Sequence, residues 1–356
     1  MPSGIVTNTD LEAIVDTSDE WIATRTGIRE RRVLAHGETL CAHAGAAAER
    51  ALEAAGCSAS DVDLVILATS SADDVFGTAC AVQAYVGASN AVAFDITAAC
   101  SGFVVALITG AHYIRCGTYA KVLVVGGDAL SRFVDWSDRN TCVLFGDGCG
   151  AALLEAQPSS LGCNLLGFAM ESDGNGRKHL NTEFALERNH QATTAPAEHS
   201  ASDDPRGRSQ GLGQGEEGKE GKDGKEGKEA EGSARLSVGA ANLSPGCGGG
   251  RLSLSPAHGG YTNLHMSGQD VFKWAVRAVP SVIQRALDAS VQPDGTPLGV
   301  EDIDWLVLHQ ANQRILSSAS SRLGIAPDKV VTNIARYGNS PPLSLPFPSL
   351  PFLCVG

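Results

Sequence analysis

The sequence lacks three patterns that would each define a class of protein. Its ten cysteines are scattered without CxxC or CxxH spacing, so neither a zinc site nor a disulfide framework is indicated, and a reducing compartment fits best. No stretch approaches the ~18–20 continuous apolar residues of a membrane span. A net charge of −13 argues against nucleic acid as the partner. No charged and then apolar leader follows Met1, so no signal peptide is expected.

Composition and periodicity predict a large α/β fold. The chain has 356 residues, of which 43% are hydrophobic, enough for a large core. Strands are predicted at 64–68, 91–96, 121–126, 141–145, 305–308 and 330–334. Helices are predicted at 41–55, 78–86, 101–116, 271–287 and 313–323. Because strands and helices alternate, the strands are expected to be parallel and joined by helical crossovers.

Cys100 stands at the junction of a strand-like and a helix-like run. Residues 91–96 are short, apolar and β-branched, whereas apolar residues recur at helical spacing from Phe103 to Arg115. A cysteine at such a junction meets the unsatisfied N–H groups and the positive dipole end of the helix. That environment favours the thiolate, which is the nucleophilic form. For this segment alone, a buried structural cysteine is the alternative.

Two further strand-like runs lead to polar residues. Residues 304–308 lead into His309, and residues 330–334 lead toward Asn339. Loops at strand ends are where α/β folds place their chemistry. Each residue alone has an ordinary interpretation, as a structural histidine and as a turn asparagine after glycine. Together with Cys100 they predict one site assembled from three strand ends.

These segments resemble a known enzyme family. Thr97–Phe103, His309–Asn312 and Tyr337–Ser340 are similar to the three active-site motifs of the β-ketoacyl-acyl carrier protein synthase III family, thiolase-fold enzymes that start fatty acid synthesis. Further similar segments are Asp16–Arg31, Phe145–Ala151 and Gly268–Lys273. The resemblance runs from about Val6 to Lys178, resumes near Gly260 and stops at Ser340.

The resemblance implies a five-layered αβαβα fold built of two related halves. The first half would span residues 1–158 and carry the nucleophile. The second would span residues 159–340 and carry His309 and Asn339. A homodimer is also expected from the resemblance.

The resemblance also implies a reaction. Cys100 would take an acyl group, most simply acetyl, from coenzyme A, and His309 and Asn339 would stabilise the enolate formed when malonyl-acyl carrier protein loses carbon dioxide. Asparagine as the third member points to the initiating class primed by coenzyme A, because chain-elongating relatives carry a second histidine there. No cofactor or metal is expected, since the coenzyme A thioester is itself a substrate.

Binding residues are carried over by the same resemblance. The residues expected to bind coenzyme A are Trp21, Arg25, Thr26 and Arg139, with the adenine between Trp21 and Arg139. Those expected to line the acyl pocket are Phe76 and Phe145, with core packing as the alternative. Those expected to bind the acidic carrier protein are Lys273, Arg314 and Arg322, with a solvated helix face as the alternative.

Two segments depart from the family pattern. Residues 188–258 are dominated by Gly, Ser, Glu and Lys and are expected to be a disordered insertion. Residues 341–356 form a Pro-rich tail in which neither helix nor central strand is expected. In the family, the loop that supplies one N–H of the oxyanion hole belongs to this region, and this sequence lacks it. The C-terminal half is therefore expected to be incomplete. A truncated or mis-spliced gene model is one interpretation of both ends of the chain.

Two other functions therefore stay open at this point. One is an inactive thiolase-fold remnant that lacks the oxyanion loop, and the other is a thioester hydrolase. The compartment expected from the sequence as it stands is the cytoplasm, and a plastid is the alternative if a transit segment precedes these residues.

Overall fold

The computed structural model describes residues 1–157, 165–183, 261–292, 295–339 and 352–355. These residues belong to one compact unit. The predicted insertion at 188–258 and most of the tail at 341–356 lie outside the described residues, and the division into halves at residue 158 stays a prediction. Within the described ranges, no helix is long and apolar enough to cross a membrane.

A four-stranded sheet forms the middle of the first half, in the order β4-β3-β5-β6. Its strands are β3 (Leu64–Ala68), β4 (Val92–Ile96), β5 (Lys121–Ala129) and β6 (Asp147–Glu155). β3 pairs in parallel with β4 and β5, which confirms the predicted arrangement for these three strands. β6 pairs antiparallel with β5, and residues 130–146 form the connection between the two strands.

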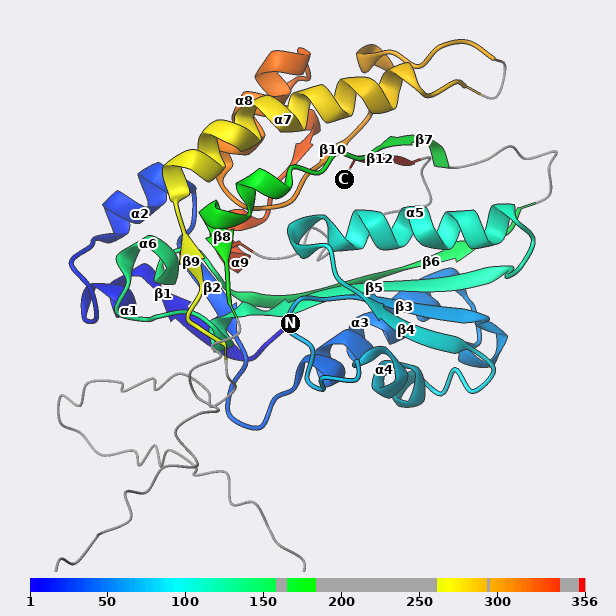
Figure 1. Cartoon of the computed structure of the whole chain (residues 1–356), viewed down its shortest axis with the longest axis horizontal. Coiled ribbons are helices and arrows are strands. Elements are labelled where there is room, and N and C mark those ends of the chain that lie inside the picture. The colour runs from blue at the N-terminus through cyan, green and yellow to red at the C-terminus, as the bar shows by residue number, and fades with distance from the viewer. Residues whose placement is uncertain (158–164, 184–260, 293–294, 340–351, 356) are drawn as a thin grey trace, which may run out of the picture. The chain divides into compact units, whose positions relative to one another are not determined.

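Helices cover both faces of this sheet (Figure 1). α3 (Leu40–Ala55) and α4 (Ala79–Val86) lie on one face, and α5 (Gly102–Arg115) lies on the other. All five residues of β3 are buried, and they alternate between the two cores: Val65 and Leu67 pack with α3 and α4, whereas Ile66 packs with α5. A strand buried on both faces reads as a continuous apolar run, which is why the sequence predicts it so clearly.

The predicted strand at 141–145 is wrong. The chain forms the short helix α6 (Arg139–Cys142) and then a loop before β6 begins at Asp147. The Asp138 carboxylate accepts a hydrogen bond from the Asn140 backbone N–H at 2.9 Å and so caps a helical turn. The apolar residues of this run are buried in a core with α2, and periodicity alone does not separate a buried turn from a buried strand.

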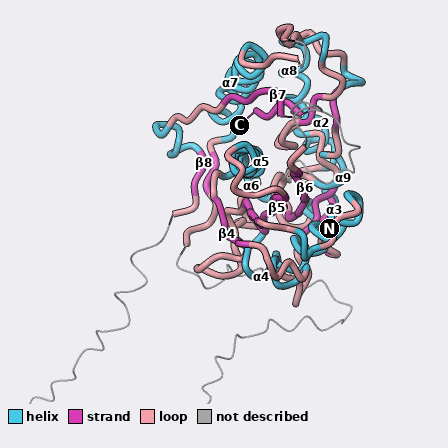
Figure 2. Tube along the Cα trace, turned by 90° about the vertical axis from the view of Figure 1, so that its right-hand side faces the viewer, coloured by secondary structure: helices cyan, strands magenta, loops and turns pink. Residues whose placement is uncertain are grey.

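The second half adds a further strand layer and a further helix layer beyond α5 (Figures 1 and 2). The helices are α7 (Gly268–Asp288), α8 (Gln313–Leu323) and α9 (Ile334–Tyr337). The strand pairs are β7 (Leu165–Ala169) with β12 (Phe352–Val355) and β10 (Leu306–Val307) with β11 (Val330–Val331), both parallel. α7 and α8 agree with the prediction, whereas the predicted strands at 305–308 and 330–334 are shorter. The order of layers is that of the αβαβα thiolase-like fold.

A strand, β12, forms in the Pro-rich tail, where the sequence predicts neither helix nor central strand; among the described strands it pairs with β7 alone. It begins at Phe352, immediately after the last proline of the chain, Pro351. Proline blocks a strand at its own position and constrains the residue before it, so four residues beyond it are free to join a sheet.

The N-terminal segments form an antiparallel hairpin of two strands. β1 (Gly4–Thr7) pairs antiparallel with β2 (Glu30–Val33), and α1 (Asn8–Glu12) and α2 (Asp19–Thr26) lie between them in sequence. A last short pair joins β8 (Leu180–Asn181) and β9 (His265–Met266). The backbone N–H of Arg29 also donates to the Ala335 carbonyl at 3.0 Å, so the hairpin is joined to α9.

Candidate active site

A cavity of about 1360 Å³ opens between α2, α5, α6, α7 and α8. Its lining is largely apolar, from residues such as Val104, Leu107 and Ile315, with a few polar side chains. The predicted site residues that line it are Trp21, Arg25, Thr26, Cys100, Arg139, Phe145, Lys273, His309, Arg314 and Asn339. Apolar walls with a few convergent polar groups are typical of sites for small organic ligands.

Cys100 lies where the sequence places it, between β4 and α5. It is the middle residue of a short 3-10 turn, Ala99–Ser101, that leads directly into α5. The preceding residue, Ala99, has φ +47° and is the one non-glycine residue with positive φ in the described chain. An L-residue held in this region is strained, and such strain gathers at functional sites. The turn therefore presents the sulfur at the N-terminal end of α5.

Two opposing influences set the pKa of the Cys100 thiol. Burial of the thiol raises its pKa. The positive charge of His309 and a hydrogen bond with His309 lower the pKa by a larger amount, so the net shift is downward. Cys100 is nevertheless solvent-accessible from the cavity. A cysteine that is accessible to substrate and has a lowered pKa has the two properties expected of a nucleophile.

His309 follows β10, and its neighbour Gln310 fixes the loop that carries it. Gln310 is 2% exposed, and its amide N–H groups donate to the carbonyls of Leu308 at 2.9 Å and Val331 at 3.2 Å. Its carbonyl oxygen accepts from the Asn333 backbone N–H at 2.9 Å. One buried side chain thus joins the ends of β10 and β11, and this holds His309 beside Cys100.

Asn339 reaches the site from the other side. Its backbone N–H donates to the Leu144 carbonyl at 3.0 Å, and its backbone forms a parallel bridge with Phe145. Asn339 is 9% exposed and Phe145 is 2% exposed, and both line the cavity. The two segments that present the third polar residue and the aromatic wall are therefore one paired unit.

Two guanidinium groups lie close to the ring of Trp21. Arg25 lies 4.5 Å and Arg139 lies 4.8 Å from the centre of its ring. Arg139 is also held by the Asp16 carbonyl, to which it donates at 2.6 Å. The Thr26 hydroxyl donates to the Ile22 carbonyl at 2.7 Å, so it serves the end of α2 as well as the cavity wall. Such a group offers a ring face and positive charge to an aromatic, anionic ligand.

The three basic residues predicted to bind a carrier protein are not equivalent. Lys273 and Arg314 are exposed residues at the cavity rim, and Arg314 lies 5.1 Å from the ring centre of Phe272. Arg322 lies in the last turn of the same helix, α8, exposed but away from the cavity lining.

Phe76 is not where the acyl-pocket prediction puts it. Its side chain is 97% exposed, and it does not line the cavity of its own chain. The physical reason is local: the Asp74 carboxylate accepts from the Phe76 backbone N–H at 2.8 Å, and Gly77 with φ +105° turns the chain. This turn directs residues 75–76 outward.

Sequence reasoning missed Asp128 at the back of the site. It is the polar residue near the end of the apolar strand β5, and that position was the signal available. One carboxylate oxygen accepts from Ser70 N at 2.7 Å and from Ser71 Oγ at 2.8 Å, while burial raises the pKa of this carboxyl. A cavity of about 30 Å³ behind Cys100 is also lined by Asp128. Across the described ranges, no group of three His, Cys, Asp or Glu side chains could hold a metal ion.

Known proteins were compared with this chain. The family models described as 3-oxoacyl-[acyl-carrier-protein (ACP)] synthase III and its C-terminal part match residues 94–174 and 294–347. The beta-ketoacyl-[acyl-carrier-protein] synthase III of Thermosynechococcus vestitus is 44% identical over 345 residues, 97% of this chain and 84% of its own length. That of Synechococcus sp. strain RCC307 is 44% identical over 342 residues, 96% of this chain and 83% of its own.

Solved structures agree with the sequence matches. The 3-oxoacyl-[acyl-carrier-protein] synthase III of Aquifex aeolicus has a TM-score of 0.64 and 32% identity, covering 97% of this chain and 85% of its own. The Thermus thermophilus enzyme has a TM-score of 0.68 and 33% identity, covering 96% of this chain and 84% of its own.

The layers and the matched relatives define a condensing acyltransferase with the thiolase-like fold. At 44% identity over nearly its whole length, the chain belongs to the β-ketoacyl-acyl carrier protein synthase III family. The activity of that family is the initiating condensation of fatty acid synthesis, in which an acyl group and malonyl-acyl carrier protein give a 3-ketoacyl product and carbon dioxide.

Proposed function

We propose that Cys100, His309 and Asn339 are the catalytic residues of this condensation. The observation that carries the proposal is that three residues from three separate segments, after β4, after β10 and after α9, line one cavity. The downward shift of the Cys100 pKa by His309 supports the role of Cys100 as nucleophile. The carry-over of these roles from the family motifs supports it independently.

The first half-reaction transfers the acyl group. The Cys100 thiolate attacks the carbonyl of acetyl-CoA, the bond from that carbonyl to the coenzyme A sulfur breaks, and coenzyme A leaves as a thiol after taking a proton. The backbone N–H of Cys100, in the turn that leads into α5, would stabilise the oxyanion. Splitting the condensation in this way replaces one difficult step with two easier ones.

The second half-reaction forms the new carbon–carbon bond. Malonyl-acyl carrier protein loses carbon dioxide, and the electron pair of the broken bond passes into an enolate. His309 and Asn339 donate hydrogen bonds to the enolate oxygen, which stabilises the charge as it develops. The enolate carbon attacks the acyl group on Cys100, and the thiolate is released. No step requires a cofactor.

Binding of the two substrates follows the geometry of the rim. The Trp21, Arg25 and Arg139 group is suited to the adenine and phosphates of coenzyme A. Because Arg139 lies 4.8 Å from the Trp21 ring centre, its side chain would have to move away for the adenine to enter between the two. Lys273 and Arg314, with Arg322 further along α8, offer positive charge to an acidic carrier protein. The phosphopantetheine arm of that carrier would then reach Cys100 through the cavity.

A homodimer is part of the proposal, and the outward turn of residues 75–76 supports it. Val75 is 91% exposed and Phe76 is 97% exposed, and two neighbouring large apolar side chains in water indicate a contact surface. Val92 on the edge strand β4 is also exposed, at 51%. In a dimer, Phe76 would be covered by the second copy, which gives the residue an apolar environment without placing it in its own cavity.

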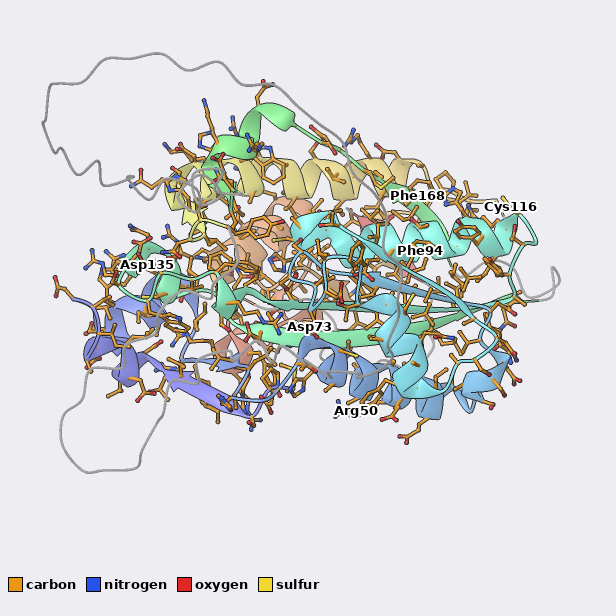
Figure 3. The ribbon with its side chains drawn as sticks, turned by 60° about the horizontal axis from the view of Figure 1, so that its bottom comes forward. Arg50, Asp73, Phe94, Cys116, Asp135 and Phe168 are labelled. Atoms are coloured by element: carbon orange, nitrogen blue, oxygen red, sulfur yellow. The ribbon has the colours of Figure 1, made fainter. Side chains whose placement is uncertain are left out.

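Acetylation of Cys100 is the test of this function. The protein is incubated with acetyl-CoA, and the intact mass and the peptide map are measured. We expect one acetyl group on Cys100, absent in Cys100→Ser and retained in Cys116→Ser, the matched control at the other end of α5 (Figure 3). A folded protein that is not acetylated would instead support an inactive remnant, and release of free acetate without malonyl-carrier would support a hydrolase.

Location is proposed from the relatives. The two compared by sequence are cyanobacterial proteins, so a plastid is the fitting compartment in a eukaryotic cell and the cytoplasm in a bacterial one.

A further inference from the structure

Arg31 is the largest fully buried side chain of the described protein, and it belongs to none of the groups discussed so far. It lies on β2, has no exposed surface, and forms no ion pair with the carboxylates of the described ranges. Burial lowers its pKa to about 10, so it remains charged at neutral pH. A buried charge is unfavourable unless hydrogen bonds or an opposite charge offset its loss of hydration. The hydrogen-bond partners of Arg31 therefore indicate what this side chain does.

The guanidinium group joins three segments. One terminal nitrogen donates to the Val6 carbonyl at 3.1 Å, and the other donates to Asn8 Oδ1 at 2.9 Å and to the Val143 carbonyl at 2.8 Å. Asn8 is in turn fixed by its own donation to the Ile28 carbonyl at 2.8 Å. The planar, charged guanidinium group of Arg31 therefore joins the hairpin β1–β2 to the loop after α6 by hydrogen bonds.

The same side chain lies against the segment that carries Asn339. A Cβ added at Gly338 would come within 2.9 Å of the Arg31 Cβ and 3.2 Å of the Leu144 carbonyl oxygen. A Cβ added at Gly146 would come within 3.1 Å of the Arg31 Cβ. Gly338 has φ +66° and ψ −158°, a conformation that is essentially restricted to glycine. Arg31 thus fills the space beneath two backbone segments that have no side chain there.

These two segments are the pair that presents the candidate active-site groups. The residue after Val143, Leu144, accepts the backbone N–H of Asn339 at 3.0 Å, and the next, Phe145, bridges to Asn339. Arg31 holds one segment by its fork and supports the other by contact. Movement of Arg31 would therefore displace Asn339, whereas Cys100 sits on a different element, at the start of α5.

We propose that Arg31 is the positioning residue for Asn339, and that it acts far more on malonyl decarboxylation than on acylation of Cys100. This inference rests on the proposed function, in which Asn339 stabilises the enolate. Since a displacement of about 1 Å can slow a reaction about a hundredfold, loss of the support slows the second half-reaction while the first continues.

The experiment compares the two half-reactions in full-length variants. Acylation is followed by intact mass with acetyl-CoA, and decarboxylation by carbon dioxide release from malonyl-acyl carrier protein without a primer. For Arg31→Met we expect acylation within about twofold of the original and decarboxylation about 10- to 100-fold slower. Arg29→Met is the matched control, because this neighbouring arginine is an exposed residue paired with Asp19 at 3.1 Å, and it should leave both rates unchanged.

A second variant keeps the inference testable if Arg31→Met does not fold. Arg31→Lys keeps the charge and a similar stem but lacks the planar fork that reaches Val6, Asn8 and Val143 together, so we expect the same separation of the two rates with a smaller loss. The double variant Arg31→Met with Asn8→Ala should lose little more than Arg31→Met alone, because Asn8 Oδ1 accepts its hydrogen bond from the Arg31 guanidinium. Equal loss in both half-reactions, or no loss in either, would overturn the positioning role.

Asn339→Ala separates this inference from the function on which it rests. If Asn339→Ala abolishes decarboxylation while the Arg31 variants retain it, only the positioning role fails. If Asn339→Ala itself decarboxylates normally, the proposed catalytic role of Asn339 fails, and the inference about Arg31 fails with it.

Discussion

Replacing Gln310 by alanine should loosen the loop that carries His309. The buried Gln310 side chain makes three hydrogen bonds, at 2.9, 3.2 and 2.9 Å, to the backbone of two strand ends and the Asn333 N–H. At ~1 kcal/mol for each neutral hydrogen bond, the variant should lose ~3 kcal/mol of unfolding free energy, and more where a backbone group is left buried and unpaired. The loss should be accompanied by slower acylation, because His309 sets the thiolate fraction of Cys100.

Urea unfolding followed by circular dichroism measures the first effect, and the rate of acetyl transfer to the enzyme measures the second. Gln284→Ala is the matched control, because Gln284 is exposed on α7 with one side-chain bond to Asp288 at 2.9 Å. It should change the stability by less than ~0.5 kcal/mol. A loss below ~1 kcal/mol in Gln310→Ala, with an unchanged acylation rate, would refute the role assigned to this side chain.

Three further predictions concern the site. In His309→Ala the pKa of Cys100 should rise, because the charge and hydrogen bond that lower it are gone, so iodoacetamide should react more slowly at pH 7 and the alkylation profile should move to higher pH; an unmoved profile would contradict the pairing. Trp21→Ala should raise the KM for acetyl-CoA by about 3- to 30-fold, the equivalent of ~0.5–2 kcal/mol, in initial-rate kinetics. Arg314→Glu should raise the KM for malonyl-acyl carrier protein and leave acylation unchanged; parallel loss of both would mean misfolding.

The parts of the fold that the sequence predicts are those with one dominant physical cause. β3 is predicted at its observed bounds because both of its faces are buried, and α8 because its apolar residues keep helical spacing between the Asn312 cap and Gly324. The segment at 141–145 fails because a capping aspartate outweighs an apolar run. β6 is not predicted either, and its antiparallel pairing departs from the parallel arrangement expected from alternation, which does not encode the direction in which a strand returns.

The site divides along the same line. Cys100, His309 and Asn339 are predictable because each stands in a recognisable motif, close in sequence to a predicted strand. Asp128 and Arg31 are not, because their importance comes from burial against segments far apart in sequence, such as the 112 positions between Arg31 and Val143. The exposure of Phe76 depends on the local turn at Asp74–Gly77, and the resemblance that suggested an acyl-pocket role gives no information about this turn.

The strained turn before Cys100 sets stability against reactivity at one position. Ala99, at φ +47°, costs about 1–2 kcal/mol relative to an ordinary backbone conformation. Glycine there would relieve the strain, yet it would also widen the unfolded ensemble and loosen the turn that aims the sulfur. Selection for thermal stability alone would therefore favour Ala99→Gly only weakly. Any gain in stability would come with a less precisely oriented Cys100 side chain. With alanine at position 99, the protein gives up some stability and in return holds Cys100 in its reactive orientation before any substrate binds.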